Sequence, residues 1–145
     1  MSIWKQEITL DLLHERQKNS LSDFLSIEFT KIEKEALFAK MPFSDKTRQP
    51  LGLLHGGANA VLAETLGSIA ANYSVDKTFQ CVGLELNINH IRPVFSGWVI
   101  GKASPIHLGR KTQIWNIDIF SEETKKQTAV SRLTVAVLPH QDRAL

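Results

Sequence analysis

The sequence has little of several features that would assign it to a special class of protein. It contains a single cysteine, Cys81, which excludes a disulfide within the chain and fits a reducing compartment. Lys and Arg number 17 against 15 Asp and Glu, a net charge of +2 that is too small to indicate a nucleic acid or a membrane surface as partner. No two of the 5 histidines have metal-ligand spacing, so we expect no metal site.

Long apolar runs are also missing. The N-terminal stretch MSIWKQEITLDLLHERQKNS mixes charged and apolar residues, unlike a signal peptide or a membrane span. We therefore expect a cytoplasmic protein without a membrane partner. No repeat, low-complexity tract or linker interrupts the 145 residues, of which 43% are hydrophobic. This length and composition predict one domain over residues 1–145.

Hydrophobic periodicity predicts one long helix between two groups of strands. An amphipathic helix is expected at 8–18, two short strands within 24–41, and a loop at 42–54. A long helix follows at 55–73, and four strands at 81–94, 98–108, 112–120 and 128–138. In the first of these four strands, the apolar residues at even positions 82–88 should share a buried face. Short connections favour antiparallel pairing, so the sequence predicts an α+β fold with one helix against one large sheet.

The two faces of the long helix differ in character. A stripe with the spacing of a core-facing side consists of Leu62, Leu66, Ile69 and Tyr73. On the far side, Glu64 is followed by Ser68 and Asn72, and the remaining residues are small or apolar: Gly57, Ala60, Val61 and Ala71. One interpretation is a solvated face that happens to carry small side chains. The other is a face covered by a second subunit, where a partly desolvated Glu64 would be a candidate base or nucleophile.

The start of this helix also suggests chemistry. His55, Gly56 and Gly57 lie where a loop enters the helix, and the first N–H groups of a helix have no internal partner. A free N–H at Gly56 or Gly57 would therefore be able to polarise a carbonyl oxygen, as an oxyanion hole does. The alternative is that the glycines only allow the chain to turn. The stretch lacks the GK[ST] ending of a phosphate-binding P-loop.

The stretch QPLGLLHGGANAVLAETLGSIAAN, from Gln49 to Asn72, resembles the signature of hotdog-fold acyl-CoA thioesterases. Further similarity lies in VGLELNINHIRPV, SGWVIGKASPIHLGRKTQIWNIDI and VSRLTVAVL, so it covers nearly the whole chain. The pattern is most similar to the branch that contains aryl-CoA thioesterases and the 1,4-dihydroxy-2-naphthoyl-CoA hydrolases of menaquinone biosynthesis. The resemblance implies a curved antiparallel sheet wrapped around one long central helix. It also implies a homodimer or homotetramer with active sites shared between subunits.

The resemblance further implies roles for individual residues. Glu64 matches the catalytic carboxylate, which acts as nucleophile or as general base on water. The backbone N–H of Gly56 matches the group that polarises the thioester carbonyl. Gln49 and His55 match residues that orient the thioester and assist departure of the thiolate. Ser68 matches a residue that positions the carboxylate or the attacking water, and in this branch it would share a subunit with Glu64 while the other three come from the partner.

Two more matches concern substrate binding. His90 matches a residue of the acyl pocket, and the turn Gly109-Arg110-Lys111 matches a region that contacts the nucleotide of coenzyme A. Without the resemblance, His90 would equally fit a strand histidine that satisfies a backbone carbonyl. The two basic residues would equally fit ordinary turn charges.

Three functions remain compatible with the sequence. The first is hydrolysis of an aromatic or medium-sized acyl-CoA, which needs no cofactor because coenzyme A is part of the substrate. The second is hydration or dehydration of an acyl thioester on the same fold. The third is a non-catalytic module that binds acyl-CoA. Glu64 argues against the third, because a purely binding pocket gains nothing from burying an unpaired carboxylate.

Overall fold

The computed structural model describes residues 1–142, so the last residues of the predicted domain, 143–145, lie outside the described residues. Two short helices come first, α1 (Leu10–Gln17) and α2 (Leu21–Phe24), followed by the strands β1 (Glu28–Ile32) and β2 (Leu37–Pro42). The long helix α3 (Gly56–Tyr73) comes next. Four longer strands follow: β3 (Phe79–His90), β4 (Trp98–Leu108), β5 (Thr112–Ser121) and β6 (Gln127–Pro139).

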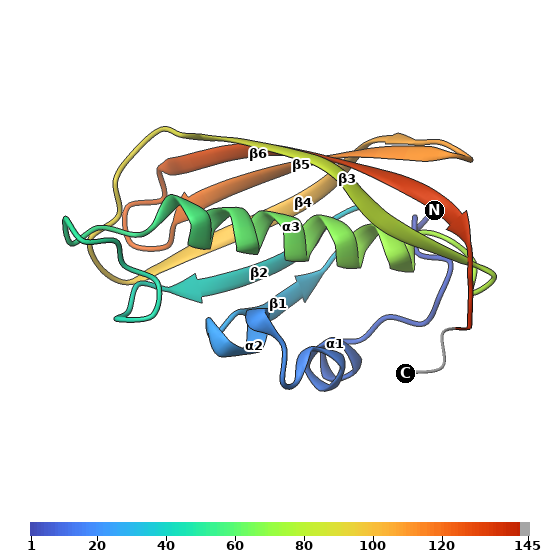
Figure 1. Cartoon of the computed structure of the whole chain (residues 1–145), viewed down its shortest axis with the longest axis horizontal. Helices are drawn as coiled ribbons and strands as arrows, with labels where there is room; N and C mark the ends of the chain where they lie inside the picture. Colours follow the sequence, from blue (N-terminus) through green and yellow to red (C-terminus); the bar gives the residue numbers. More distant parts are fainter. Residues whose placement is uncertain (143–145) are drawn as a thin grey trace.

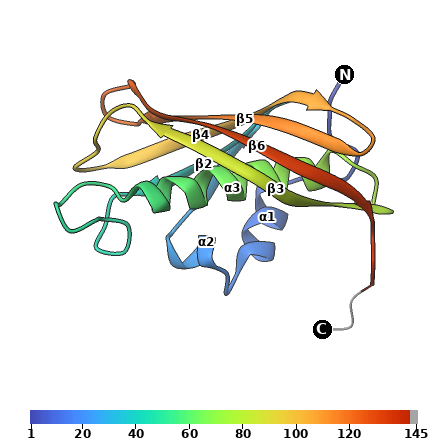
Figure 2. The same ribbon diagram turned by 45° about the horizontal axis from the view of Figure 1, so that its top comes forward.

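The six strands form one curved antiparallel sheet around α3. Their order across the sheet is β1-β2-β4-β5-β6-β3, and every neighbouring pair is antiparallel. Figure 1 shows α3 running along the sheet, and in Figure 2 the sheet lies above α3 while α1 and α2 lie below it. The predicted α+β fold, a curved antiparallel sheet wrapped around one long central helix, is confirmed.

The short helices differ from the prediction at their ends. α1 begins at Leu10 rather than at residue 8, because the side chain of Thr9 accepts a hydrogen bond from an N–H of the first turn and caps the helix. The sequence predicts a strand from residue 24, whereas α2 occupies that position and is capped in the same way by Ser20. A helix of four residues is too short to produce a hydrophobic period, so the sequence pattern does not reveal it.

α3 packs the predicted apolar stripe against the sheet. One residue of the stripe is less buried than predicted, and one residue of the opposite side is more buried than predicted. Leu62 and Leu66 are completely buried, but Ile69 is only half-buried. Ala71, predicted for the far side, is completely buried because β3 curls over this end of the helix, where the Sγ of Cys81 lies 3.5 Å from the Ala71 carbonyl oxygen. Although α3 is largely apolar, no helix among residues 1–142 is long and apolar enough to cross a membrane.

The helix approaches the sheet closely because glycines lie at the contact. A methyl group on Gly101 of β4 would stand 2.5 Å from the Cδ1 of Leu66. A methyl group on Gly67 of α3 would stand 2.5 Å from the Cδ2 of Leu133 and 3.4 Å from the Cδ1 of Ile117. The two separations of 2.5 Å are below van der Waals contact, so the spacing between helix and sheet depends on both glycines.

Replacement of Gly67 with alanine tests this spacing. Alanine has the higher helix propensity, by about 1 kcal/mol. Leu133 and Ile117 are completely buried, so we expect overpacking to prevail and to lower the free energy of unfolding by about 1–3 kcal/mol. Urea denaturation of the variant and the wild type measures the difference. A stabilised variant would mean that the helix and sheet are farther apart than described.

β3 is an edge strand with an irregularity that reverses its alternation. Val82 and Leu84, predicted to be buried, are 42% and 60% exposed, whereas Leu86 is half-buried as predicted. The pairing with β6 shifts register between Gly83 and Glu85. Because an extra residue in one strand moves the following side chains to the opposite face, the odd positions before the bulge and the even positions after it face α3. Gly83 is thereby directed at the helix.

Candidate active site

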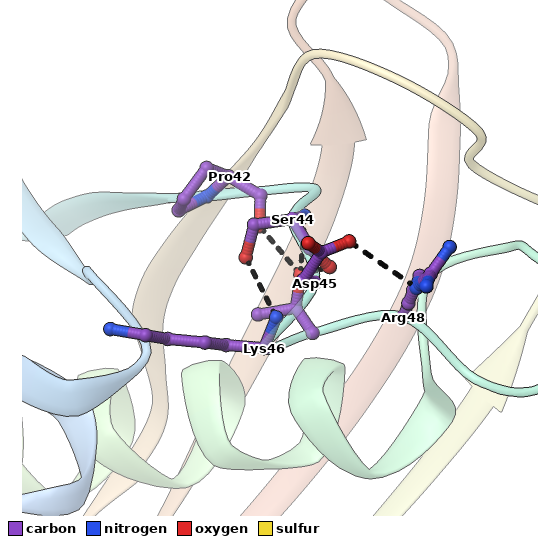
Figure 3. Close-up of polar contacts among 6 residues, drawn as sticks. Pro42, Ser44, Asp45, Lys46 and Arg48 are labelled. Atoms are coloured by element: carbon purple, nitrogen blue, oxygen red, sulfur yellow. Dashed lines mark hydrogen bonds and ion pairs between the residues drawn. The ribbon is translucent and has the colours of Figure 1, made fainter.

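The loop between β2 and α3, residues 43–55, carries the predicted site residues Gln49 and His55. At its centre, Thr47 is 1% exposed. Its hydroxyl donates to the carbonyl of Pro42 at 2.8 Å and accepts from the N–H of Ser44 at 2.9 Å, within the turn drawn in Figure 3. Its carbonyl accepts from the N–H of His55 at 2.7 Å. These bonds hold the loop in one shape and place His55 at the start of α3.

The variant Thr47→Val tests whether this hydroxyl holds the loop. Valine keeps the shape of the side chain but leaves the partly buried partners at Pro42 and Ser44 without their hydrogen bonds, so the free energy of unfolding should fall by about 1–3 kcal/mol. Thermal denaturation measures the loss. Asp45→Ala is the control, because its ion pair with Arg48 at 3.4 Å lies at the surface and should contribute less than about 1 kcal/mol. Equal effects of both variants would contradict this role of Thr47.

The start of α3 has one backbone N–H group without a partner among residues 1–142. His55 caps the helix, and its Nδ1 accepts from the N–H of Gly57 at 2.8 Å. The amide of Gly57 is therefore engaged within the chain. Gly56, the first helical residue, has no carbonyl one turn earlier to bind. Of the two glycines that the sequence suggests as carbonyl-polarising groups, Gly56 is thus the one with a free N–H, at the positive end of the helix dipole.

A cavity at the start of α3 brings three predicted site residues together. This helix-start cavity has a volume of about 350 Å³ and is lined by Gln49, Leu53, Leu54, Gly56, Asn59, His90, Ile91, Arg92, Pro93 and Val94. The ring of His90 packs on Gly56, where a Cβ would stand 2.7 Å from its Nε2. The side-chain Oε1 of Gln49 accepts from the N–H of Leu51, which leaves its NH₂ group as a donor.

Glu64 lies in a second cavity, near the middle of α3. This Glu64 cavity, about 490 Å³ in volume, is lined by Ser20, Leu21, Ser22, Ala60, Val61, Glu64, Thr65 and Leu86. Glu64 is the one charged residue among these lining residues. The hydroxyl of Ser68 donates to its Oε1 at 3.1 Å. A Cβ on Gly83 of β3 would stand 2.5 Å from the same oxygen, so the carboxylate rests against bare backbone.

The two cavities of one chain have no lining residue in common. Gly56 and Glu64 are eight residues apart on α3, which at 1.5 Å per residue separates their backbones by about 12 Å. Gly56 lines one of these cavities and Glu64 the other, so one chain does not place the two groups around a common cavity. Glu64 and Ser68 thus lie together at one cavity, and Gln49, Gly56 and His90 lie together at the other. His55 does not line that cavity but caps the helix next to Gly56.

The turn Gly109-Arg110-Lys111 lies at a third cavity, at the opposite end of α3 from Gly56. This cavity of about 1120 Å³ is lined by these three residues, by the N-terminal residues Met1, Ser2, Ile3 and Lys5, and by Glu35, Ser74, Val75, Asp76, Phe79, Leu108, Gln113 and Val137. The turn is tight, with the N–H of Gly109 donating to the carbonyl of Thr112 at 3.0 Å. The cavity is lined by three basic residues, Lys5, Arg110 and Lys111, and by two carboxylates, Glu35 and Asp76. The basic residues can bind an anionic group there, although the charge of the lining is mixed.

Cys81 contributes nothing to nucleophilic chemistry. It is buried, its Sγ points to the carbonyl of Ala71, and burial raises the pKa of its thiol to about 11. The thiolate, which is the reactive form, is therefore almost absent at neutral pH. Among the described residues around the two smaller cavities, the carboxylate of Glu64 is the better candidate nucleophile or base.

Comparison with known proteins identifies the family of the chain. The model of the thioesterase superfamily matches residues 51–128. A Vibrio cholerae protein that is named only as a candidate esterase is 49% identical over 94% of this chain and 91% of its own length. The 1,4-dihydroxy-2-naphthoyl-CoA hydrolase of Escherichia coli is 44% identical over 94% of this chain and 99% of its own length. A crystal structure of a thioesterase from Haemophilus influenzae superposes with a TM-score of 0.93, at 42% identity, and covers 97% of this chain and 99% of that one.

The residues matched by the family model include lining residues of both smaller cavities. The family model includes His55, Gly56, Glu64, Ser68 and His90, and the similarity to the solved thioesterase covers nearly all of the chain. The predicted hotdog fold and the predicted thioester hydrolase activity are confirmed. The chain belongs to the thioesterase superfamily.

Proposed function

We propose that this protein hydrolyses the thioester bond of an aromatic or medium-sized acyl-CoA to the free acid and coenzyme A. The observation that carries the proposal is Glu64, a carboxylate that is hydrogen-bonded by Ser68 in a largely apolar cavity. Hydrolysis needs an activated water or a carboxylate nucleophile, together with a donor for the carbonyl oxygen. Glu64 supplies the first and the N–H of Gly56 the second.

The active site of this proposal is shared between two copies of the chain. Gly56 and Glu64 lie about 12 Å apart along α3 and line separate cavities of one chain, which supports a site completed by a second chain. In a two-fold dimer, the Glu64 cavity of one subunit would face the helix-start cavity of its partner, and each site would then be complete. The half-exposed side of α3 near Glu64, with its small residues, suits the close approach of a second chain. A homodimer or homotetramer therefore forms part of the proposal.

Each site residue has a role that its contacts permit. The N–H of Gly56 polarises the thioester carbonyl, and the NH₂ of Gln49 helps to orient it. Because Nδ1 of His55 accepts from Gly57, the neutral ring carries its proton on Nε2, which can donate to the departing sulfur. Ser68 holds the carboxylate of Glu64 in place.

The remaining predicted residues bind the two ends of the substrate. His90 lines the pocket for the acyl group beside Gly56. The basic turn Gly109-Arg110-Lys111 contacts the phosphates of the coenzyme A nucleotide at the cavity of about 1120 Å³. No further cofactor takes part. A cytoplasmic location fits this function and the single free cysteine.

Both possible roles of Glu64 give the same overall reaction. As a base, its carboxylate takes a proton from water while the water oxygen bonds to the carbonyl carbon. As a nucleophile, the carboxylate oxygen bonds to that carbon and forms an anhydride, which water then cleaves. In both routes the carbon–sulfur bond breaks, the sulfur leaves as thiolate and takes up a proton, and the oxyanion that forms on the way is stabilised by the N–H of Gly56.

The aromatic class of substrate is supported by the sequence resemblance and by the name of the relative from Escherichia coli, a 1,4-dihydroxy-2-naphthoyl-CoA hydrolase. A panel assay tests it, with release of free thiol followed for 1,4-dihydroxy-2-naphthoyl-CoA, benzoyl-CoA, phenylacetyl-CoA, hexanoyl-CoA and palmitoyl-CoA. We expect rapid release from the aromatic and medium-sized thioesters and slow release from palmitoyl-CoA. Equal rates on all five would contradict the proposed substrate class, and no release from any would contradict the proposed reaction.

A further inference from the structure

Asn59 is a buried polar residue that the roles described above leave unused. It lies on α3 one turn after Gly56, is only 5% exposed and lines the helix-start cavity. Its Oδ1 is buried and has no hydrogen-bond partner among residues 1–142. Native structures rarely leave such an atom unpaired, because its loss of hydration is not offset. An unpaired amide at the wall of a proposed substrate cavity suggests that its partner is the substrate.

A second asparagine on the same helix shows what a structural role looks like. The NH₂ of Asn72 donates to the carbonyls of Ser68 at 2.9 Å and Cys81 at 3.0 Å, and its Oδ1 accepts from the N–H of Cys81 at 2.9 Å. Asn72 thus fastens the helix to the edge strand β3. Asparagine destabilises a helix slightly because of its low helix propensity. At position 72 the three hydrogen bonds compensate for this cost, whereas the Oδ1 of Asn59 makes no such bond.

The position of Asn59 fits a contact with the acyl group. Side chains on a helix tilt toward its N-terminus, so the amide of Asn59 is directed toward the turn of Gly56, where the thioester carbonyl binds in the proposed mechanism. Apolar side chains form much of the surrounding wall: Leu53, Leu54, Ile91, Pro93 and Val94. An aromatic ring would be enclosed by these residues, and a polar substituent on the ring would lie within a mostly apolar cavity beside the amide.

A hydroxyl group is the substituent that best satisfies this amide. It donates and accepts, so it pairs with the amide of Asn59 whichever way the amide is turned. We propose that Asn59 is a specificity residue that binds a ring hydroxyl on the aromatic acyl group. This inference rests on the proposed function and extends it, because a ring without the hydroxyl would leave the amide unpaired and would be discriminated against.

Matched pairs of substrates test the inference. The first pair is 1-hydroxy-2-naphthoyl-CoA and 2-naphthoyl-CoA, and the second set compares benzoyl-CoA with its 2-, 3- and 4-hydroxy derivatives. The wild type should prefer the hydroxylated partner, for at least one ring position, by about 10- to 100-fold in kcat/KM. Asn59→Leu, which is similar in size but apolar, should reduce that ratio to about one by losing activity only on the hydroxylated substrate.

Stability separates this role from a structural one. Asn59→Leu should unfold at the same or a higher temperature, because it removes a buried unpaired atom, whereas Asn72→Leu should unfold at a lower temperature. An unchanged ratio in Asn59→Leu, or a wild type without preference, would overturn the inference. A lower melting temperature together with dissociation in size-exclusion chromatography would also overturn it, because Asn59 would then contact the second chain.

A binding measurement keeps this test separate from the test of the reaction. In the Glu64→Ala background, Kd values for the same pairs should show the preference for the hydroxylated ring, and Asn59→Leu in that background should abolish it. Absence of thiol release by the wild type would defeat the proposed function, while the Kd ratio would still decide the role of Asn59. A Kd ratio of one in the presence of normal turnover would defeat the inference alone.

Discussion

Glu64→Ala should lower kcat for thioester hydrolysis by about 10³- to 10⁴-fold, with little change in the oligomeric state or the melting temperature. The carboxylate is the group that activates water or attacks the carbonyl carbon, and general-base catalysis alone contributes about 10²- to 10⁴-fold. Its replacement removes no core packing, because Glu64 lies at a half-exposed position in its cavity. Thiol release by the variant and the wild type under saturating substrate gives the ratio.

Two further variants serve as controls for this result. Ser68→Ala removes only the hydrogen bond to Glu64, so a smaller loss of about 10- to 100-fold is expected, the equivalent of one hydrogen bond to a charged group. Glu15→Ala removes an exposed carboxylate of α1 that pairs with Lys18 and should leave kcat unchanged. Near-normal turnover in Glu64→Ala would show that another group performs the chemistry.

Gly83→Ala should reduce kcat by about 100-fold while the protein remains folded. The new methyl group would stand 2.5 Å from the Oε1 of Glu64, and the far end of a glutamate side chain can move aside without disturbing the backbone. Displacement of a reacting group by about 1 Å costs about 10²-fold in rate. The effect should therefore fall on kcat rather than on stability, which kinetic assays and thermal denaturation measure together.

Val82→Ala is the control for this strand. Val82 precedes Gly83 but faces away from α3 and is 42% exposed, so its truncation should change neither kcat nor the melting temperature by much. A wild-type kcat in Gly83→Ala would mean that the reacting position of Glu64 is not the one against β3. A large loss of stability would mean that the strand, and not the carboxylate, absorbs the added methyl group.

Local patterns in the sequence predict most of the fold. The helical period of Leu62, Leu66 and Tyr73 and the alternation in β4, β5 and β6 follow directly from burial on one face of each element. Those patterns fail at the bulge after Gly83, where one extra residue reverses which side chains face the helix. They also fail in α2, which is too short to show a repeat of hydrophobic residues. The sequence shows a glycine at position 83 but does not show which face it takes.

Some residues of the candidate site can be predicted from the sequence, and others cannot. Glu64 and Ser68 are visible in the sequence because they are one turn apart on one helix, and His55 and Gly56 because they mark a helix start. Thr47 was not predicted, since its buried hydroxyl acts through a loop whose path only the structure gives. Asn59 also lacks a sequence signal, because an unpaired amide is recognised only when its surroundings are known.

The sharing of the active site between two chains is tested most directly by mixing inactive subunits. Glu64→Ala and Gln49→Ala each disable one half of the site, and each variant alone should release little thiol from an aromatic acyl-CoA. When the two are unfolded together and refolded at equal concentration, half of the dimers are mixed and each mixed dimer contains one intact site, so thiol release should return to about one quarter of the wild-type rate. Activity that stays at the level of the separate variants, although mixed dimers have formed, would place Glu64 and Gln49 in the same chain's site and contradict the account.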